Sequence, residues 1–282
     1  MTKRVVINCT ESQPWESSMY RVVYEQTEAV IKGIKLLIYI LGARKADIAV
    51  EEEKKALIDR IESHIADKAL IGIKDTTSKH PISINERLIY TLYNKRVPLG
   101  GMDYDVGYAV FTPETAVAVY RALSTGMPMI HKRVTVAGDC INNPQNLIVP
   151  IGTSVSDIAE FCGGTKKRFK RVLRGGAFMG EVAEGDGVVG KTDNSLLFFS
   201  SQKKERTGCI RCGQCIDVCP VGLSPVLLAA YSEKGLYEEC LKIGADYCVE
   251  CGCCAYTCPS GIPITSLIKK AKKKGGTEDE QA

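Results

Sequence analysis

Hydrophobic positions in the first 128 residues switch repeatedly between a strand-like and a helix-like period. Apolar runs typical of buried strands occupy residues 4–9, 46–50, 70–74 and 105–111. Between and after these runs, apolar residues at helical spacing predict helices over 18–41, 51–69 and 87–94, and from Pro113 onward. Strands that alternate with helices through short connections predict a parallel α/β layer domain over residues 1–128.

The expected helices carry start signals. Ser18 stands where it can cap the first helix, and Ser83 with Glu86 has the spacing of a capping box. The run "EEEKK" would put acids in the first turn of the second helix, where they suit the helix dipole. Thr112 and Pro113 have the residue types of an N-cap and a first helical position.

The pattern changes at residue 129. Residues 129–140 and 146–152 read as strands, 154–164 as a short helix closed by glycines, and 168–176 as another extended segment. "RGGAFMG" lies among these strands and indicates a turn of a hairpin. Strands crossed by one helix predict a small β-grasp module of SLBB type over residues 129–200.

The remaining residues, 201–282, carry a duplicated cysteine motif. "CIRCGQCIDVCP" begins at Cys209, and "CVECGCCAYTCP" repeats its spacing 39 residues later, at Cys248. This spacing with its Cys-Pro ending is typical of two-cluster ferredoxins, in which the fourth cysteine ligates the other cluster. We therefore predict a helical domain with two [4Fe–4S] clusters, including a helix opened by Ser224 and Pro225. The first cluster would take Cys209, Cys212, Cys215 and Cys258, and the second Cys248, Cys251, Cys254 and Cys219.

Other uses of the cysteines fit less well. Zinc usually takes four thiolates from paired knuckles, which this spacing does not match. A disulfide framework needs an oxidising compartment, and "MTKRVVINC" has no apolar core of signal-peptide length. Five cysteines remain, and buried apolar packing is their ordinary role: Cys9, Cys140, Cys162, Cys240 and Cys253. Cys253 lies between two predicted ligands, but the first repeat has Gln214 in its place, so the register favours Cys251 and Cys254.

Composition sets the outer bounds. With 282 residues, 45% of them hydrophobic, the chain can bury a large core, and its net charge is only +4. Part of that charge lies in "KKAKKK" near the C-terminus, which we expect to be a frayed, solvated tail; an acidic partner or a membrane surface is the alternative. No basic face with interleaved aromatics indicates nucleic acid. The apolar stretch "GIKLLIYILGA" is too short to span a bilayer, which favours a cytoplasmic protein at most peripheral to the inner face of the membrane.

In this order of parts the sequence resembles RnfC, the peripheral subunit of the Rnf electron-transport complex, and more distantly the flavin-bearing NADH subunit of respiratory complex I. The resemblance rests on both cysteine runs and on "INCTESQPW", "AVIKGIKLLIYILGA", "KRVPLGGMDYDVGYAV", "RVTVAGD" and "RGGAFMG". It implies that the α/β domain descends from one that binds FMN and NADH.

The flavin-site pattern of that family is incomplete here. Asn8, Glu11 and Pro14 match it, whereas Gln13 stands where the family has an acid. Other departures are Met19, Tyr20, Ser83, Ile84, Asn85 and Thr112. The glycine-rich loop that should approach the flavin is expected before the first residue of this sequence. We therefore expect no FMN in this chain, with Asn8, Glu11 and Trp15 as vestiges of its site.

These observations favour an electron-transfer subunit without a catalytic site of its own. It would pass single electrons through two clusters between a flavin- or metal-bearing partner and ferredoxin or a similar carrier. Two alternatives remain open. One is an NAD(P)H or ferredoxin oxidoreductase, or a cobalamin-reductase subunit, whose flavin loop comes from another chain. The other is an iron–sulfur redox sensor or assembly platform.

Overall fold

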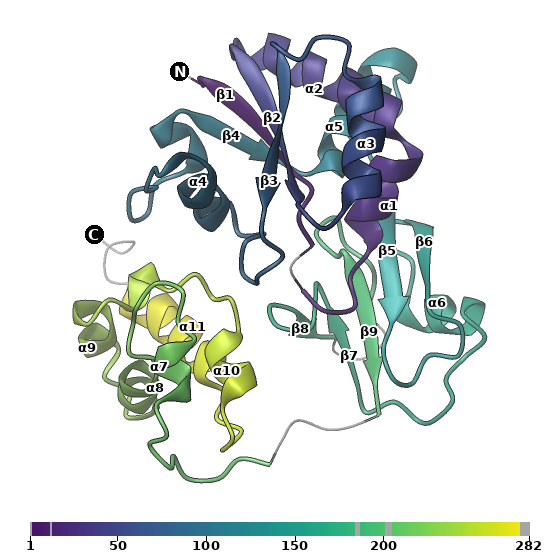
Figure 1. Ribbon diagram of the computed structural model, residues 1–282. Coiled ribbons are helices and arrows are strands. Elements are labelled where there is room, and N and C mark those ends of the chain that lie inside the picture. Colours follow the sequence, from purple (N-terminus) through teal and green to yellow (C-terminus); the bar gives the residue numbers. More distant parts are fainter. Residues whose placement is uncertain (1, 12, 184–186, 201–204, 277–282) are drawn as a thin grey trace. The chain divides into compact units, whose positions relative to one another are not determined.

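A computed structural model describes residues 2–11, 13–183, 187–200 and 205–276 (Figure 1). The chain divides into two compact units, Met1–Ser201 and Gln202–Ala282. The first unit contains two sheets, each with its own hydrophobic core. The described residues of the second unit form helices and loops.

The first sheet is parallel throughout, as predicted. Its strands are β1 (Arg4–Asn8), β2 (Lys45–Glu51), β3 (Ile71–Thr76) and β4 (Tyr108–Phe111), in the order β3-β2-β1-β4. Five helices accompany them: α1 (Ser18–Glu25), α2 (Thr27–Leu41), α3 (Lys55–His64), α4 (Asn85–Tyr93) and α5 (Pro113–Thr125). A 3-10 turn, η1 (Asp103–Val106), precedes β4. Helices α1, α2, α3 and α5 cover one face of this sheet, and α4 covers the other (Figure 1). Side chains alternate along β1, so Val5 and Ile7 pack on the first face and Val6 packs with α4.

The predicted continuous helix over residues 18–41 is wrong, because the chain breaks at Gln26 into α1 and α2. Gln26 has φ −125° and ψ 32°, outside helical geometry. The buried Thr27 hydroxyl donates to the Val23 carbonyl oxygen at 2.7 Å, and such back-bonding bends helices. Ser18 does not act as the cap either: Ser17 takes that position, and Ser18 is a buried first residue of α1.

Two other predicted helix starts are also wrong. Glu51 ends β2, and α3 begins only at Lys55, so no acid lies in its first turn. The capping box of Ser83 and Glu86 does not form, since Ile84 takes the N-cap position of α4 and no side chain bonds there. Thr112 is confirmed as a cap, because its hydroxyl accepts from the Thr115 N–H at the start of α5.

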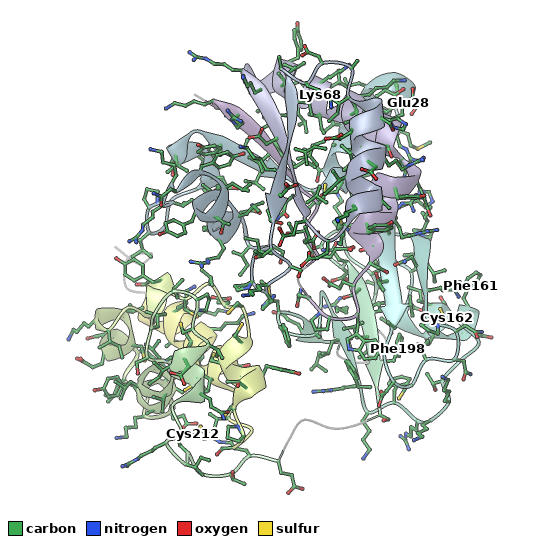
Figure 2. All side chains as sticks on the ribbon, in the orientation of Figure 1. Glu28, Lys68, Phe161, Cys162, Phe198 and Cys212 are labelled. Carbon is green, nitrogen blue, oxygen red and sulfur yellow. The ribbon has the colours of Figure 1, made fainter. Side chains whose placement is uncertain are left out.

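The second sheet is mixed and confirms the β-grasp prediction. Its strands are β5 (His131–Ala137), β6 (Gln145–Pro150), β7 (Arg171–Arg174), β8 (Glu181–Val182) and β9 (Ser195–Phe199), in the order β6-β5-β9-β7-β8. β5 and β9 run parallel, and the other pairs are antiparallel. Helix α6 (Val155–Phe161), capped by Ser154, packs Ile158 into a core with the buried Phe198 of β9 (Figure 2). "RGGAFMG" joins β7 to β8 as a hairpin turn, as expected.

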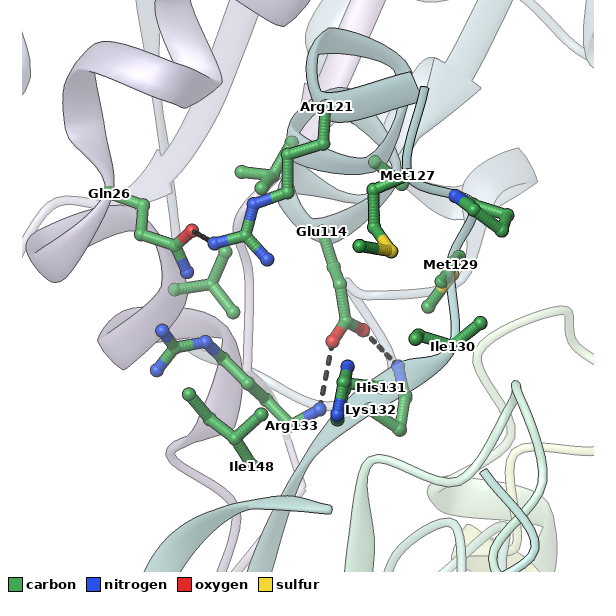
Figure 3. A pocket seen from close by; sticks show the side chains of 14 residues that line it. Gln26, Glu114, Arg121, Met127, Met129, Ile130, His131, Lys132, Arg133 and Ile148 are labelled. Atoms are coloured by element: carbon green, nitrogen blue, oxygen red, sulfur yellow. Dashed lines mark hydrogen bonds and ion pairs between the residues drawn. The ribbon is translucent and has the colours of Figure 1, made fainter. Parts of the chain in front are cut away.

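A buried ion pair joins the two sheets of the first unit. The Glu114 carboxylate at the start of α5 accepts from the Lys132 ammonium and from the Arg133 N–H of β5 (Figure 3). Removing one partner would leave an uncompensated buried charge, so this pair makes the layer domain and the β-grasp module depend on each other.

The second unit contains five helices in its described part: α7 (Gln214–Asp217), α8 (Pro225–Glu233), α9 (Tyr237–Lys242), α10 (Cys253–Thr257) and α11 (Ile264–Gly275). A 3-10 turn, η2 (Ala245–Tyr247), follows α9. Leu228 of α8, Cys240 of α9 and Ile268 of α11 share one core. α8 begins at Pro225, as predicted, although Ser224 makes no side-chain cap bond.

The basic segment 269–274 lies within α11, so the expected frayed tail is wrong for these residues. Residues 277–282 lie outside the described part of the chain. Among the helices that are described, none is long and apolar enough to cross a bilayer.

Candidate metal centre

The two cysteine runs adopt the same local backbone conformation. Arg211 and Glu250, which occupy equivalent positions in the repeats, both have φ 56°. The glycines two residues later, Gly213 and Gly252, both have φ 80° and lead into α7 and α10. A non-glycine residue in the left-handed region costs energy and persists only where its surroundings fix it. The two loops therefore share one backbone shape, and the repeat alignment is the only sequence signal for Arg211 and Glu250.

The first group of thiols contains Cys209, Cys212, Cys215 and Cys258. Burial raises the pKa of Cys215, and the negative charges of Cys258, Cys212 and Cys209 raise it further. The charge of Cys258, the fourth cysteine of the second run, thus reaches Cys215 of the first run, as the predicted exchange of the fourth ligand requires. Cys258 is buried, whereas Cys209 is exposed. Cys212 is also exposed at the surface of the unit (Figure 2).

The second group lines a cavity. Cys219 from the first run and Cys248, Cys251 and Cys254 from the second run all contribute to its wall. Burial raises the pKa of Cys248, and it raises that of Cys254 to about 11. These thiols are therefore protonated at neutral pH, and binding a metal through them would release protons.

Polar groups next to this cavity reach the sulfurs. The Leu223 N–H donates to Cys219 Sγ at 3.3 Å, and Cys254 Sγ lies 3.6 Å from Thr265 Oγ1 of α11. Hydrogen bonds to ligating sulfurs are one means by which a protein sets the potential of an iron–sulfur cluster. Cys253 also lines the cavity, and its hydrogen bond to Cys251 raises its pKa.

The donor set fits iron–sulfur clusters. All thirteen cysteines are free of disulfides, and each of the two predicted sets holds four of them, the number of thiolates that a [4Fe–4S] cluster takes. When bound, such clusters supply one-electron redox chemistry. Cys9, Cys140, Cys162 and Cys240 are buried elsewhere in the two units, as expected of apolar packing.

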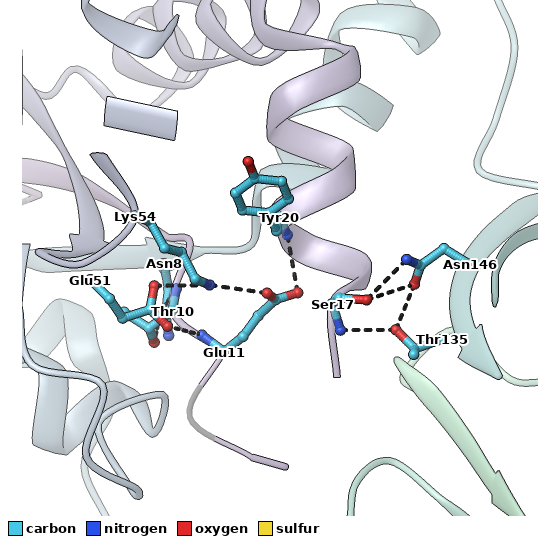
Figure 4. Close-up of polar contacts among 9 residues, drawn as sticks. All are labelled: Asn8, Thr10, Glu11, Ser17, Tyr20, Glu51, Lys54, Thr135 and Asn146. Atoms are coloured by element: carbon cyan, nitrogen blue, oxygen red, sulfur yellow. Dashed lines mark hydrogen bonds and ion pairs between the residues drawn. The ribbon is translucent and has the colours of Figure 1, made fainter. Parts of the chain in front are cut away.

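The expected vestiges of a flavin site have their polar groups satisfied by the protein itself. The Asn8 amide donates to the Ser83 carbonyl oxygen, and its oxygen accepts from Thr10. The Glu11 carboxylate accepts from the Tyr20 N–H and pairs with Lys54 at 3.0 Å (Figure 4). FMN bound at these residues would therefore have to displace contacts that both side chains already make within the protein.

Gln13 and Trp15 face the β-grasp module instead. The Gln13 side-chain oxygen accepts from the Phe178 and Met179 N–H groups, and its nitrogen donates to the Gly175 oxygen. Trp15 is 53% exposed and meets the Phe199 ring edge-on at 6.4 Å. Gln13, which in the sequence stands out only as the replacement of an acid, thus anchors the "RGGAFMG" turn.

Comparisons with known families match three parts of the chain. The Nuo51 FMN-binding domain family matches residues 1–121, the SLBB domain family residues 133–182, and the 4Fe-4S dicluster domain family residues 208–262.

Curated relatives cover most of the chain. The C subunit of the proton-translocating ferredoxin:NAD(+) oxidoreductase complex of Clostridium ljungdahlii is 32% identical over 83% of this chain and 52% of its own length. The C subunit of the Na(+)-translocating complex of Acetobacterium woodii is 30% identical, over 84% of this chain and 54% of that protein. The C subunit of the ion-translocating oxidoreductase complex of Rhodobacter capsulatus is 33% identical, over 85% of this chain and 47% of that protein. The chain spans about half the length of these relatives.

The fold also matches a solved structure. NAD+-reducing [NiFe]-hydrogenase in its air-oxidized state aligns with a TM-score of 0.60 at 15% identity, over 96% of this chain and 47% of that chain. The H2-reduced state of the same hydrogenase aligns with a TM-score of 0.59 at 16% identity, over 87% of this chain and 45% of that chain. These likenesses concern the fold alone. With its layer domain, SLBB module and dicluster domain in this order, the chain belongs to the RnfC-like proteins.

Proposed function

We propose that this chain is an electron-transfer subunit of a multi-subunit oxidoreductase. Two [4Fe–4S] clusters would carry single electrons between a flavin- or metal-bearing partner and ferredoxin or a similar carrier. One cluster is bound by Cys209, Cys212, Cys215 and Cys258, and the other by Cys248, Cys251, Cys254 and Cys219. The chain is peripheral to the cytoplasmic side of its complex and holds no flavin of its own.

The exchange of the fourth cysteine supports this proposal most. Cys258 acts electrostatically on Cys215, and Cys219 lines the cavity of Cys248, Cys251 and Cys254. Two sites that exchange their fourth cysteine in this way are held close to each other. Electron transfer between two clusters needs this closeness, whereas a single structural metal does not. Residues 1–128 and 129–200 then act as docking domains that fix the distance between the clusters and the partner's cofactor.

A second candidate is an oxidoreductase subunit that completes a flavin site together with another chain. The match of residues 1–121 to the Nuo51 FMN-binding domain family favours it. The contacts of Asn8 and Glu11 within the protein count against it, because a flavin would have to displace them.

Anaerobic reduction of the isolated, cluster-loaded chain distinguishes the two. Dithionite should bleach its visible absorption and produce the electron paramagnetic resonance signals of reduced [4Fe–4S] clusters. NADH should neither bleach the chain nor let it reduce a viologen dye. Reduction by NADH without any other protein would overturn the proposed relay role.

A further inference from the structure

We infer that the outer face of α11 is the docking surface for a small acidic electron-carrier protein. This inference rests on the proposed function and names the partner's chemistry and the place where it binds. The surface is defined by Lys270, Lys273 and Lys274, which are exposed and, at spacings of three and four residues, lie on one side of the helix.

The charge on this helix has one sign. From Ile264 to Gly275 it carries five lysines and no acidic residue. Lys272 and Lys269 reach inward to Glu250 on the second cysteine loop, at 2.8 Å and 3.6 Å. The ammonium groups of Lys270 and Lys274 lie over the Tyr237 ring, at 5.8 Å and 5.6 Å from its centre. Two of the three exposed lysines therefore border an aromatic side chain, a composition suited to a brief complex with an acidic protein.

Neighbouring acids reduce this charge only in part. Helix α9, which packs against α11, carries Glu238 and Glu239, and Lys242 holds Glu239 at 2.8 Å. Among the described residues the lysine face thus carries more positive than negative charge, which favours electrostatic steering of an acidic partner.

The opposite side of α11 forms part of the second cysteine site. Thr265 and Ile268 line the cavity, and Thr265 Oγ1 lies 3.6 Å from Cys254 Sγ. Lys272 Nζ donates to the Cys248 carbonyl oxygen at 3.1 Å. A helix with its side chains is about 10–12 Å across, so a carrier on the lysine face lies about one helix diameter from this site. A single helix therefore connects a docking face to the site that would bind the second cluster.

An anionic membrane is a poorer partner for this helix. Amphipathic helices bind membranes by burying an apolar face among the lipids. Here Ile264, Ile268 and Ala271 form that face, and all three are packed in the core of the unit. This helix could therefore bind a lipid surface through the charge of its lysines alone.

Electron transfer from the cluster-loaded full chain to a purified acidic two-cluster ferredoxin tests the inference. The chain is reduced with dithionite, freed of excess reductant and mixed with oxidised ferredoxin in a stopped-flow spectrometer. The second-order rate should fall steeply between about 10 mM and 500 mM salt, because salt screens steering. K270E/K273E/K274E should lower the low-salt rate by at least about tenfold and remove the salt dependence. K270Q/K273Q/K274Q, which removes the charges without introducing acids, should give an intermediate rate. This variant controls for misfolding caused by the introduced glutamates.

K167E/R168E/K170E is the matched control, since it reverses three exposed charges on the β-grasp module. It should stay within about twofold of the unchanged chain. Equal rates for the two triple reversals, or a rate insensitive to salt, would overturn the docking surface. So would binding of the chain to phosphatidylserine vesicles that depends on these lysines without any effect on ferredoxin. A failure of the relay itself would look different, because dithionite would then produce no cluster signal in any variant.

Discussion

Cys253 is the residue whose role most directly tests the register of the second cysteine run. It lines the same cavity as the predicted ligands and hydrogen-bonds to Cys251. The equivalent position of the first run is Gln214, which cannot act as a thiolate ligand.

Changing Cys253 to alanine should therefore leave both clusters in place. Iron analysis of Cys253→Ala is expected to match the unchanged chain at about eight irons. Cys254→Ala is the matched control, one residue away, and should lose roughly half of the iron. The reverse pattern would mean that Cys253 is the ligand and that our register is shifted.

Glu16 makes the stability of the first unit depend on pH. Burial raises the pKa of its carboxyl to about 7, from 4.5, although the Ser195 hydroxyl donates to it at 2.9 Å and opposes that shift. The folded state therefore holds a proton that the unfolded chain has released at the same pH. This contribution to stability is complete below about pH 4.5 and is lost as the pH rises through about 7.

Glu16→Gln should remove this part of the pH dependence. Urea unfolding can be followed through Trp15, the only tryptophan, which lies in the first unit. At pH 8 the variant should be more stable than the unchanged chain by roughly 1–3 kcal/mol, with a smaller difference at pH 5. Glu160→Gln, at an exposed position of α6, should keep the original slope. A variant that retained the decline between pH 5 and 8 would contradict the assignment to Glu16.

At the level of elements, the β7–β8 turn depends on the segment that follows β1. Gly176 has φ 112°, and a Cβ there would lie 2.2 Å from the Gln13 side chain. Any larger residue must therefore both strain the backbone and displace Gln13 from the Phe178 and Met179 N–H groups.

Gly176→Ala should lower the free energy of unfolding by about 2–4 kcal/mol, measured by the same fluorescence signal. Gly152→Ala shares a positive φ, 95°, but meets nothing within 4 Å, so it should cost only about 1 kcal/mol. Adding Gln13→Ala to Gly176→Ala should recover part of the loss, because the clash disappears. Equal costs for the two glycine changes would exclude the proposed contact.

Sequence patterns predicted which elements form more reliably than where they begin. Strands β1 to β6 and the helix after Thr112 follow from apolar runs and from a cap that needs only local residues. The break at Gln26 coincides with the hydrogen bond of the buried Thr27 hydroxyl to the Val23 carbonyl oxygen. Next to the start of α4, the Ser83 carbonyl oxygen accepts from Asn8, 75 residues away. Burial and distant partners decide such details, and no local pattern contains them.

At the scale of the whole molecule, the order of the three parts could be predicted because each part has its own pattern: strands alternating with helices, strands with one helix, and a duplicated cysteine motif. The grouping of the cysteines into two ligand sets stays a prediction, made from a duplicated motif that constrains both halves at once. The contacts that join the layer domain to the β-grasp module could not be predicted. Glu114 pairs with Lys132 and Gln13 with the "RGGAFMG" turn only because the chain brings separate elements together. The boundaries at residues 128 and 200 remain predictions.

The most direct test of the account is the cofactor content of the purified chain. Iron, acid-labile sulfide and flavin are measured per polypeptide after anaerobic purification and reconstitution with iron and sulfide. We predict about eight irons, about eight sulfides and no flavin. One flavin per chain would contradict a relay without its own flavin site, and zinc in place of iron and sulfide would contradict the clusters themselves.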